Sequence, residues 1–108
     1  MPVDRTPLSV VVAAPADAPG VSALLEAGVG EARGGAPVRV ILTHDGLAVL
    51  STKWPERLAT AGVDVALCSR SARERGLPPG NVTDGVRWSS LTTFLAEGSI
   101  GRLWSAFP

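Results

Sequence analysis

The sequence predicts an α/β protein with a three-layer α/β/α arrangement, in which helices cover both faces of a mostly parallel sheet of about five strands. Two observations predict this fold class. Short runs rich in valine, leucine and isoleucine alternate with segments in which apolar residues recur at helical spacing. The first of these runs is almost continuously apolar, which is typical of strands covered on both faces. Strands that alternate with helices imply parallel pairing through right-handed crossovers.

The first half of the chain supplies two strands and three helical segments. Residues 8–14 and 38–43 are the predicted strands. A helix lies between them, with Val21, Leu24, Leu25 and Val29 on one face and Gly34-Gly35 at its end. After the second strand comes a His44-Asp45-Gly46 turn, in which Asp45 is a candidate cap for a short helix to Leu50. Another helix begins near Thr52 and ends at Gly62.

The second half repeats this alternation. Residues 63–68 form a buried strand, and a short helix follows it, capped by Ser69 or Ser71 and stopped at Gly76. A polar loop spans residues 77–84. The remaining expected elements are a short strand over 86–88, a helix capped by Ser89 or Ser90 with Leu91, Phe94 and Leu95 facing inward, and a last strand over 102–107 with Leu103, Trp104 and Phe107.

The composition excludes several functional classes. Residues 1–108 are 45% hydrophobic, so a single well-packed domain is expected. Ten basic residues balance ten acidic ones, so no net charge favours nucleic acid or an anionic membrane. No apolar run approaches the roughly twenty residues of a membrane span, and residues 8–14 are interpreted as a core strand, not a secretory leader. One cysteine and one histidine are too few for a zinc site, and no cofactor is expected.

Cys68 is the residue on which the functional interpretation depends. It is the only cysteine, and it stands where a predicted strand ends and a predicted helix begins. Free backbone N–H groups and the positive end of a helix dipole favour a thiolate at such a position, and the side chains of Arg70, Arg73 and Arg75 add positive charge. The alternative is that Cys68 is a small buried hydrophobe. An unpaired cysteine also fits a reducing compartment, so a cytoplasmic location is expected.

Two other cysteine chemistries are disfavoured by the residues around Cys68. A phosphatase loop needs an arginine six positions after its cysteine, and that position holds Glu74, which would repel a phosphate. A rhodanese-type loop needs glycines that turn backbone N–H groups inward, and this loop has none. The phosphatase interpretation is therefore rejected, and the rhodanese one is kept only as a minor alternative.

The order of these segments resembles the DsrE/DsrF-like family of small sulfur-relay (TusD-like) proteins. The likeness covers nearly the whole chain and includes the valine-rich first strand, VRVILTHDGL with its Asp-Gly turn, AGVDVALCSRSARERGL, and GVRWSSLTTFLAEG. Its most specific part is residues 61–68 running into 72–77. In that family the cysteine at the matching position carries a persulfide, so the resemblance implies this role for Cys68.

The resemblance implies a sulfur carrier or sulfurtransferase that passes sulfane sulfur between donor and acceptor proteins or low-molecular-weight persulfides. It also implies a homo-oligomer. The candidate substrate-binding residues, for which a solvated-face or capping role stays open, are His44, Asp45, Ser69, Arg70 and Arg73. Several family members lack the cysteine, so the rival interpretation is a non-catalytic binding or assembly module. Trp54, Trp88 and Trp104 are interpreted as packing anchors or oligomer contacts.

Overall fold

The structure is a computed structural model that describes residues 5–77, 85–98 and 101–107. Residues 78–84, most of the predicted polar loop, lie outside the described part. The strands are β1 (Leu8–Val12), β2 (Val38–Leu42), β3 (Asp64–Cys68), β4 (Val86–Ser89) and β5 (Arg102–Ala106). The helices are α1 (Val21–Arg33), α2 (Trp54–Thr60), α3 (Ser69–Glu74), α4 (Leu91–Glu97) and the 3-10 helix η1 (His44–Ser51).

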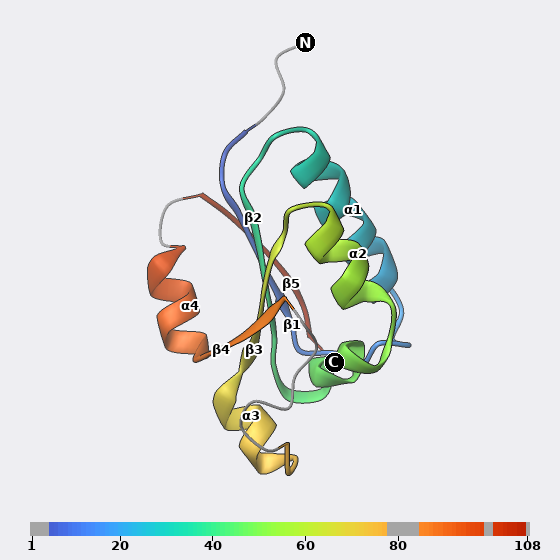
Figure 1. The fold of residues 1–108 in the computed structure, drawn as a ribbon, viewed down its shortest axis with the longest axis vertical. Helices are drawn as coiled ribbons and strands as arrows, with labels where there is room; N and C mark the ends of the chain where they lie inside the picture. The colour runs from blue at the N-terminus through green and yellow to red at the C-terminus, as the bar shows by residue number, and fades with distance from the viewer. Residues whose placement is uncertain (1–4, 78–84, 99–100, 108) are drawn as a thin grey trace.

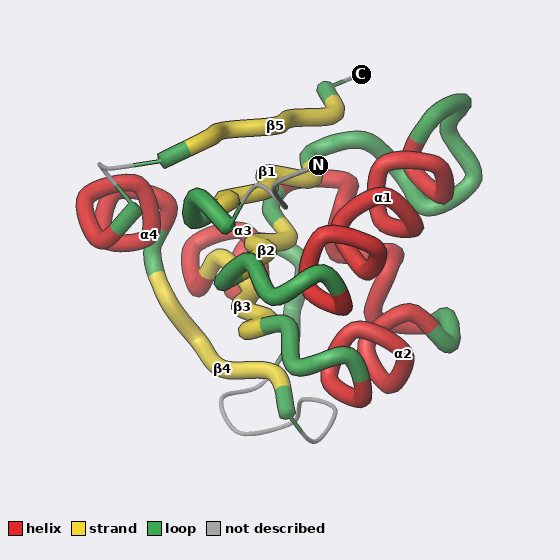
Figure 2. The backbone as a smooth tube through the Cα atoms, turned by 90° about the horizontal axis from the view of Figure 1, so that it is seen from above, coloured by secondary structure: helices red, strands yellow, loops and turns green. Residues whose placement is uncertain are grey.

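The five strands form one sheet in the order β4-β3-β2-β1-β5, and every pair is parallel. The chain steps outward from β1 to β4 and then returns across the sheet, so that β5 pairs with the other side of β1. Right-handed crossovers put helices on opposite faces when the direction of stepping reverses. Accordingly, α1 and α2 cover one face, and α4 covers the other (Figures 1 and 2). The predicted three-layer, mostly parallel α/β/α fold is confirmed.

The two faces of the sheet hold separate cores. The face under α1 and α2, which we call the closed face, carries the larger core, in which Leu25, Leu58 and Leu67 are fully buried. The face under α4, which we call the thin face, carries a small core made of Val11, Ile41, Ala66, Cys68 and Phe94. None of the described helices has the length and apolar character needed to cross a membrane.

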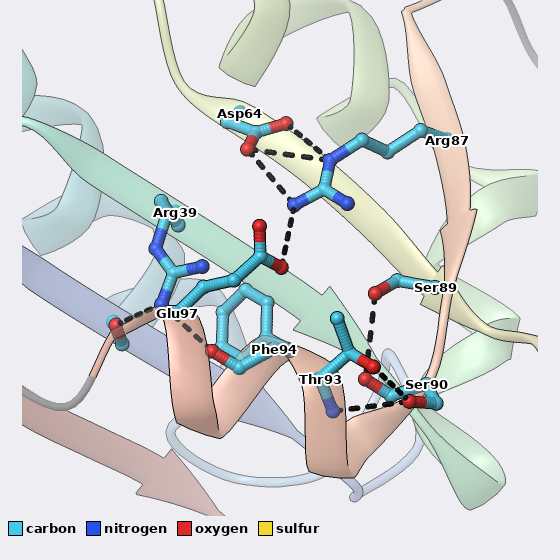
Figure 3. Close-up of polar contacts among 9 residues, drawn as sticks. Arg39, Asp64, Arg87, Ser89, Ser90, Thr93, Phe94 and Glu97 are labelled. Atoms are coloured by element: carbon cyan, nitrogen blue, oxygen red, sulfur yellow. Dashed lines mark hydrogen bonds and ion pairs between the residues drawn. The ribbon is translucent and has the colours of Figure 1, made fainter.

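Helix α4 is fixed to the thin face by polar contacts at both ends (Figure 3). At its start, the Ser90 hydroxyl accepts a hydrogen bond from the Thr93 N–H at 3.0 Å, so Ser90 is the predicted cap. Near its end, the Arg39 guanidinium donates to the Phe94 carbonyl at 2.9 Å and lies 4.3 Å from the centre of the Phe94 ring. Through these two contacts with Phe94, the Arg39 side chain of β2 holds the short helix against the strands.

Three large apolar side chains in the last part of the chain are exposed. Leu95 was predicted on the inward face of its helix, yet 40% of it is exposed, because Phe94 alone of the α4 residues is buried. Leu103 is 59% exposed and lies on the thin face of β5, opposite Trp104, which packs toward the closed face. Phe107 follows the end of β5 and is 64% exposed. Within the described residues, the one short helix on the thin face does not extend over β5 (Figure 2).

The helix starts also differ from prediction in detail. The N-cap residues of η1 and α3 are Thr43 and Cys68, and neither makes a side-chain cap hydrogen bond, so Asp45, Ser69 and Ser71 are not the N-caps that were predicted. Asp45 instead accepts a hydrogen bond from Arg75 at 2.8 Å, because the Arg75 side chain reaches back from the end of α3 to the start of η1. Helix α2 begins at Trp54, where the N–H is capped by the Thr52 hydroxyl at 3.1 Å.

Candidate functional site

A pocket of 430 Å³ lies where the carboxyl ends of β2 and β3 meet the first residues of η1, α3 and α4. Ligands of open α/β sheets bind at this edge because helix starts and loop side chains converge there. The lining residues are Thr43, His44, Cys68, Arg70, Ser71, Glu74, Ser90, Leu91 and Thr92. The pocket therefore brings together residues from three separate crossovers.

Cys68 is the last residue of β3 and immediately precedes α3, as predicted. Its side chain lies on the thin face, where it belongs to the small core with Ile41 and Phe94. It is only 6% exposed, but it also lines the pocket. The thiol is therefore covered by apolar groups on one side and open to a polar hollow on the other.

Two buried hydroxyls that line the pocket together with Cys68 bind His44. Thr43 is fully buried at the end of β2, and Ser71 is 3% exposed in the first turn of α3. Their oxygens are 3.2 Å apart, and either hydroxyl can donate to the other. The Ser71 hydroxyl accepts the His44 backbone N–H at 3.0 Å, and the Thr43 hydroxyl lies 3.0 Å from His44 Nδ1. A closed set of hydrogen bonds thus joins the end of β2 to the start of α3.

The pKa of the Cys68 thiol is lowered from its ordinary value. Burial is the largest single effect, and it raises the pKa because it disfavours the charged form. The Ser71 backbone N–H, the Ser71 and Thr43 hydroxyls and the Arg70 backbone N–H act in the opposite direction, since they stabilise the thiolate. Together these hydrogen bonds lower the pKa by more than burial raises it. A larger fraction of Cys68 is therefore thiolate at neutral pH than of an ordinary cysteine.

His44 is held in a conformation that few non-glycine residues adopt. Its φ is 51°, in the left-handed region, which costs on the order of 1–2 kcal/mol for a residue with a Cβ. The hydrogen bond from its N–H to Ser71 helps to offset this cost. On the other side, Gly46 packs so tightly that a Cβ there would lie 2.0 Å from the Val12 carbonyl oxygen. Both contacts fix the turn that presents the imidazole to the pocket.

The sequence-predicted site residues divide into two groups. Cys68, His44 and Arg70 line the pocket. Arg70 is largely exposed and pairs with Glu74 at 3.2 Å. Asp45, Ser69 and Arg73 are not among the lining residues. Asp45 pairs with Arg75 at a neighbouring hollow of 410 Å³, near Ala13 and Phe107 at the ends of β1 and β5.

Thr43 and Ser71 are the functional candidates that the sequence analysis did not select. Ser71 was considered only as a helix cap, and Thr43 only as the last residue of a strand. Their signal in the sequence is weak because each is a single hydroxyl next to an apolar run. Only the parallel pairing of β2 with β3 brings the two side chains together. Within the described residues, no group of three or more His, Cys, Asp or Glu side chains is arranged to hold a metal ion.

Comparison of the sequence with models of protein families gives no match, and comparison with curated proteins gives none either. Solved structures do match the fold. The YchN protein from E. coli has a TM-score of 0.79 at 17% identity, over 94% of this chain and 99% of that one. MTH1491 from Methanobacterium thermoautotrophicum, described as a protein of unknown function, has a TM-score of 0.68 at 18% identity, again over 94% and 99% of the two chains. This chain shares the fold of both proteins, since each comparison spans nearly the whole of both chains.

Proposed function

We propose that the protein is a sulfur carrier of the DsrE/DsrF-like family, a sulfurtransferase that holds sulfane sulfur as a persulfide on Cys68. One observation carries the proposal. The only cysteine of the chain has a lowered pKa and lines a polar pocket at the carboxyl edge of the sheet. A thiolate with access to a small hollow is what thiol–persulfide exchange requires.

The chemistry needs no cofactor. The Cys68 thiolate attacks the outer sulfur of a donor persulfide R–S–SH, the bond between the two donor sulfurs breaks, and the donor leaves as the thiolate R–S⁻. Cys68 then carries the group –S–SH. In the second step an acceptor thiolate attacks that outer sulfur, and the Cys68 thiolate is regenerated. Because the chain has no second cysteine, the acceptor is another molecule, either a protein or a low-molecular-weight thiol.

Mass spectrometry of the intact protein after incubation with glutathione persulfide tests this function. The wild type is expected to gain the mass of one sulfur atom, and dithiothreitol should remove it. Cys68→Ser is the matched control because the hydroxyl cannot accept sulfane sulfur, and this variant should gain nothing. A wild type that gains no sulfur, or a Cys68→Ser variant that gains as much, contradicts the proposal.

A second candidate function is a non-catalytic binding or assembly module in which Cys68 is core packing. The observation that favours it is the 6% exposure of Cys68 among Val11, Ile41, Ala66 and Phe94. The two functions differ in native alkylation by iodoacetamide. The carrier should react with a midpoint below pH about 8.5, the value of a free thiol. A thiol that reacts only after denaturation supports the module.

We also propose that residues 1–108 form a single DsrE-like domain that assembles into a homo-oligomer in the cytoplasm. The exposed apolar side chains of Leu95, Leu103 and Phe107 support assembly because a subunit contact would remove them from water. The three tryptophans instead pack partly buried against the larger core. Light scattering should give a multiple of the monomer mass, and a clean monomer at micromolar concentration would count against assembly.

The single domain is tested separately. If residues 1–108 form one domain, their unfolding in urea should be one cooperative transition.

A further inference from the structure

The ion pair between Asp45 and Arg75 lies beside the pocket that contains Cys68. Both charged residues line a neighbouring hollow of 410 Å³, together with the exposed ring of Phe107. His44 lines this hollow as well as the Cys68 pocket, so the two adjoin at its side chain. The ion pair also lines a third hollow, of 430 Å³. A ligand in the Cys68 pocket can therefore extend past His44 to a fixed pair of opposite charges.

The hydrogen bonding of this ion pair is incomplete. Among the described residues, a single hydrogen bond joins Arg75 Nη2 to Asp45 Oδ1, at 2.8 Å. In the pair between Arg57 and Glu26, by contrast, two parallel hydrogen bonds occupy both carboxylate oxygens. Asp45 Oδ2 and the Nε and Nη1 groups of Arg75 have no hydrogen-bond partner within the described part of the chain. Donors and an acceptor thus remain for a ligand, and a guanidinium can bind a carboxylate through two of its N–H groups.

A second ion pair with a single hydrogen bond is held less firmly. Arg70 and Glu74 line the Cys68 pocket and are joined at 3.2 Å. They are four residues apart on the same helix, and 84% of the Arg70 side chain is exposed. Only 37% of the Arg75 side chain is exposed, since it bridges the end of α3 and the start of η1. Because ordering a mobile side chain costs affinity, a ligand that needs a fixed guanidinium is expected at Arg75.

Two opposite charges side by side favour a ligand that carries both charges. A ligand with a carboxylate alone would be attracted by Arg75 and repelled by Asp45, and a ligand with an amine alone would meet the reverse. An α-amino-acid group has an ammonium and a carboxylate on one carbon atom. Arg75 can donate to this carboxylate while the free oxygen of Asp45 accepts from the ammonium. The pair therefore matches a zwitterionic head group.

The distance from the thiol to the ion pair determines the size of the ligand. Cys68 precedes α3 and Arg75 follows it, so their backbones are about 10 Å apart at the rise of an α-helix. An extended peptide of three residues spans about the same length. Cysteine persulfide is too short to bring its sulfur to Cys68 and its amino-acid group to Arg75. In a glutathione-type tripeptide, the γ-linked glutamate carries the amino-acid group farther from the thiol.

We propose that Asp45 and Arg75 bind the zwitterionic α-amino-acid head of a glutathione-type peptide thiol, whose sulfur then lies at Cys68. The inference rests on the proposed function and names the class of the donor, a low-molecular-weight peptide persulfide. Asp45 and Arg75 bind and orient this donor, and they take no part in the transfer of sulfur. Their effect is to bring the outer sulfur of the donor to the Cys68 thiolate.

Binding of S-methylglutathione to the full chain tests this site without any transfer of sulfur, because the methyl group blocks the thiol of the ligand. Isothermal titration calorimetry should detect binding to the wild type. Arg75→Gln and Asp45→Asn should each raise the Kd about tenfold, the effect of losing a hydrogen bond to a charged group. Arg57→Gln breaks an ion pair that lines none of the three hollows and should leave the Kd unchanged. No binding at millimolar ligand, or an equal loss in Arg57→Gln, overturns the proposal.

The N-acetyl derivative of S-methylglutathione separates the roles of the two charges. Acetylation removes the ammonium and keeps the carboxylate, so the wild type should bind this derivative about tenfold more weakly. Arg75→Gln should weaken its binding further, whereas Asp45→Asn should not, because Asp45 then has no ammonium to bind. If Asp45→Asn weakens the binding of both ligands equally, Asp45 only holds Arg75 in place, and the zwitterion site is overturned.

The length of the donor is tested by the rate of sulfur uptake, followed by mass spectrometry of the intact protein. Arg75→Gln should lower kcat/KM for glutathione persulfide about tenfold more than for cysteine persulfide, mainly through KM, because only the longer donor reaches the ion pair. An equal loss for the two donors overturns the proposal.

The failure of this site and the failure of the proposed function give different results. A protein that binds S-methylglutathione through both charges but takes up no sulfane sulfur keeps the head-group site and is not a carrier. A protein that takes up sulfane sulfur but does not bind S-methylglutathione is a carrier without this site. Calorimetry reports the site, and mass spectrometry reports the carrier.

Discussion

The closed face and the thin face of the sheet are built in different ways. On the closed face, α1, η1 and α2 cover the strands almost completely, and the buried side chains there are aliphatic. On the thin face, α4 contributes one buried side chain, Phe94, and the same surface of the sheet carries Ser9, Arg39 and Arg87. The closed face supplies the greater part of the apolar burial, whereas the thin face mixes apolar and polar contacts.

This difference explains why the pocket lies on the thin side. A cysteine on the closed face would be surrounded by aliphatic side chains, and burial alone would set its pKa, above the ordinary value. Cys68 lies on the thin face at the carboxyl edge, where Thr43 and Ser71 can reach its sulfur. A single residue step along β3 would move it to the closed face, because side chains alternate along a strand. The chemistry depends on that alternation.

The largest expected effect comes from truncation of the main apolar contact on each face. Phe94→Ala should lower the free energy of unfolding by about 3–5 kcal/mol and Leu58→Ala by about 2–5 kcal/mol, since both side chains are fully buried. Only Phe94→Ala should also speed native alkylation of Cys68, because Phe94 covers the thiol and Leu58 lies on the other face. Urea denaturation and iodoacetamide kinetics measure the two quantities.

Equal acceleration of alkylation by both truncations would contradict the separation of the faces. It would mean that Cys68 is exposed by global unfolding and not by local loss of α4. Measuring both variants well below their denaturation midpoints keeps the comparison within the folded state.

A smaller loss of stability is expected when Gly46 or Gly98 is replaced by alanine. At Gly46 the new Cβ would lie 2.0 Å from the Val12 carbonyl oxygen, a backbone atom that cannot move aside. At Gly98 the nearest atoms are side-chain atoms of Arg39 and Ser9, which can rotate away. Gly46→Ala should therefore cost about 1–3 kcal/mol, as overpacking does, and Gly98→Ala less.

The stability of the two variants, measured in urea, is the first readout. Gly46→Ala should also slow alkylation of Cys68, because it displaces the turn that holds Thr43 and His44. Gly30→Ala is the control, since a Cβ there meets nothing within 4 Å and alanine favours a helix. A Gly46→Ala variant as stable as the wild type would show that this contact is not tight.

The fold could be predicted from the sequence because it depends on patterns that repeat. The first three strands were predicted from their apolar runs, and the parallel sheet from the alternation of strands with helices. The prediction was wrong where the burial of a side chain depends on whether another helix packs over it, and not on the spacing of apolar residues in the sequence. Leu95 was predicted to face inward, but among the described elements no second helix packs over the thin face to bury it. The spacing of apolar residues along the sequence does not show how many helices cover each face of the sheet.

Within the site, the position of Cys68 between β3 and α3 was predicted because strand and helix signals meet there. The partners of the sulfur could not be predicted. Thr43 and Ser71 are 28 residues apart, and their contact arises from the pairing of β2 with β3 and from the direction in which α3 leaves the sheet. Arg73 illustrates the converse, since its charge is close to Cys68 in sequence while its side chain does not line the pocket.

The smallest expected effect is a pH dependence of stability caused by Cys68. The pKa of its thiol is lower in the folded chain than in the unfolded chain, so the unfolded state binds more protons between the two values. Stability from the thiolate is therefore fully present above the unfolded value, about 8.5, and is lost as pH falls through the folded one. The free energy of unfolding of the wild type, relative to Cys68→Ser, should rise with pH across this window.

The sign of this slope distinguishes the two faces most directly. A thiol governed by burial alone, as expected on the closed face, would have a raised pKa, and its stability contribution would fall as pH rises through the unfolded value. Urea denaturation of wild type and Cys68→Ser at a series of pH values and constant ionic strength measures the difference. Thr43→Val should flatten the rise, because it removes one donor to the thiolate. A falling difference in the wild type would place Cys68 with the apolar core, and the hydroxyls of Thr43 and Ser71 would then have no effect on its ionisation.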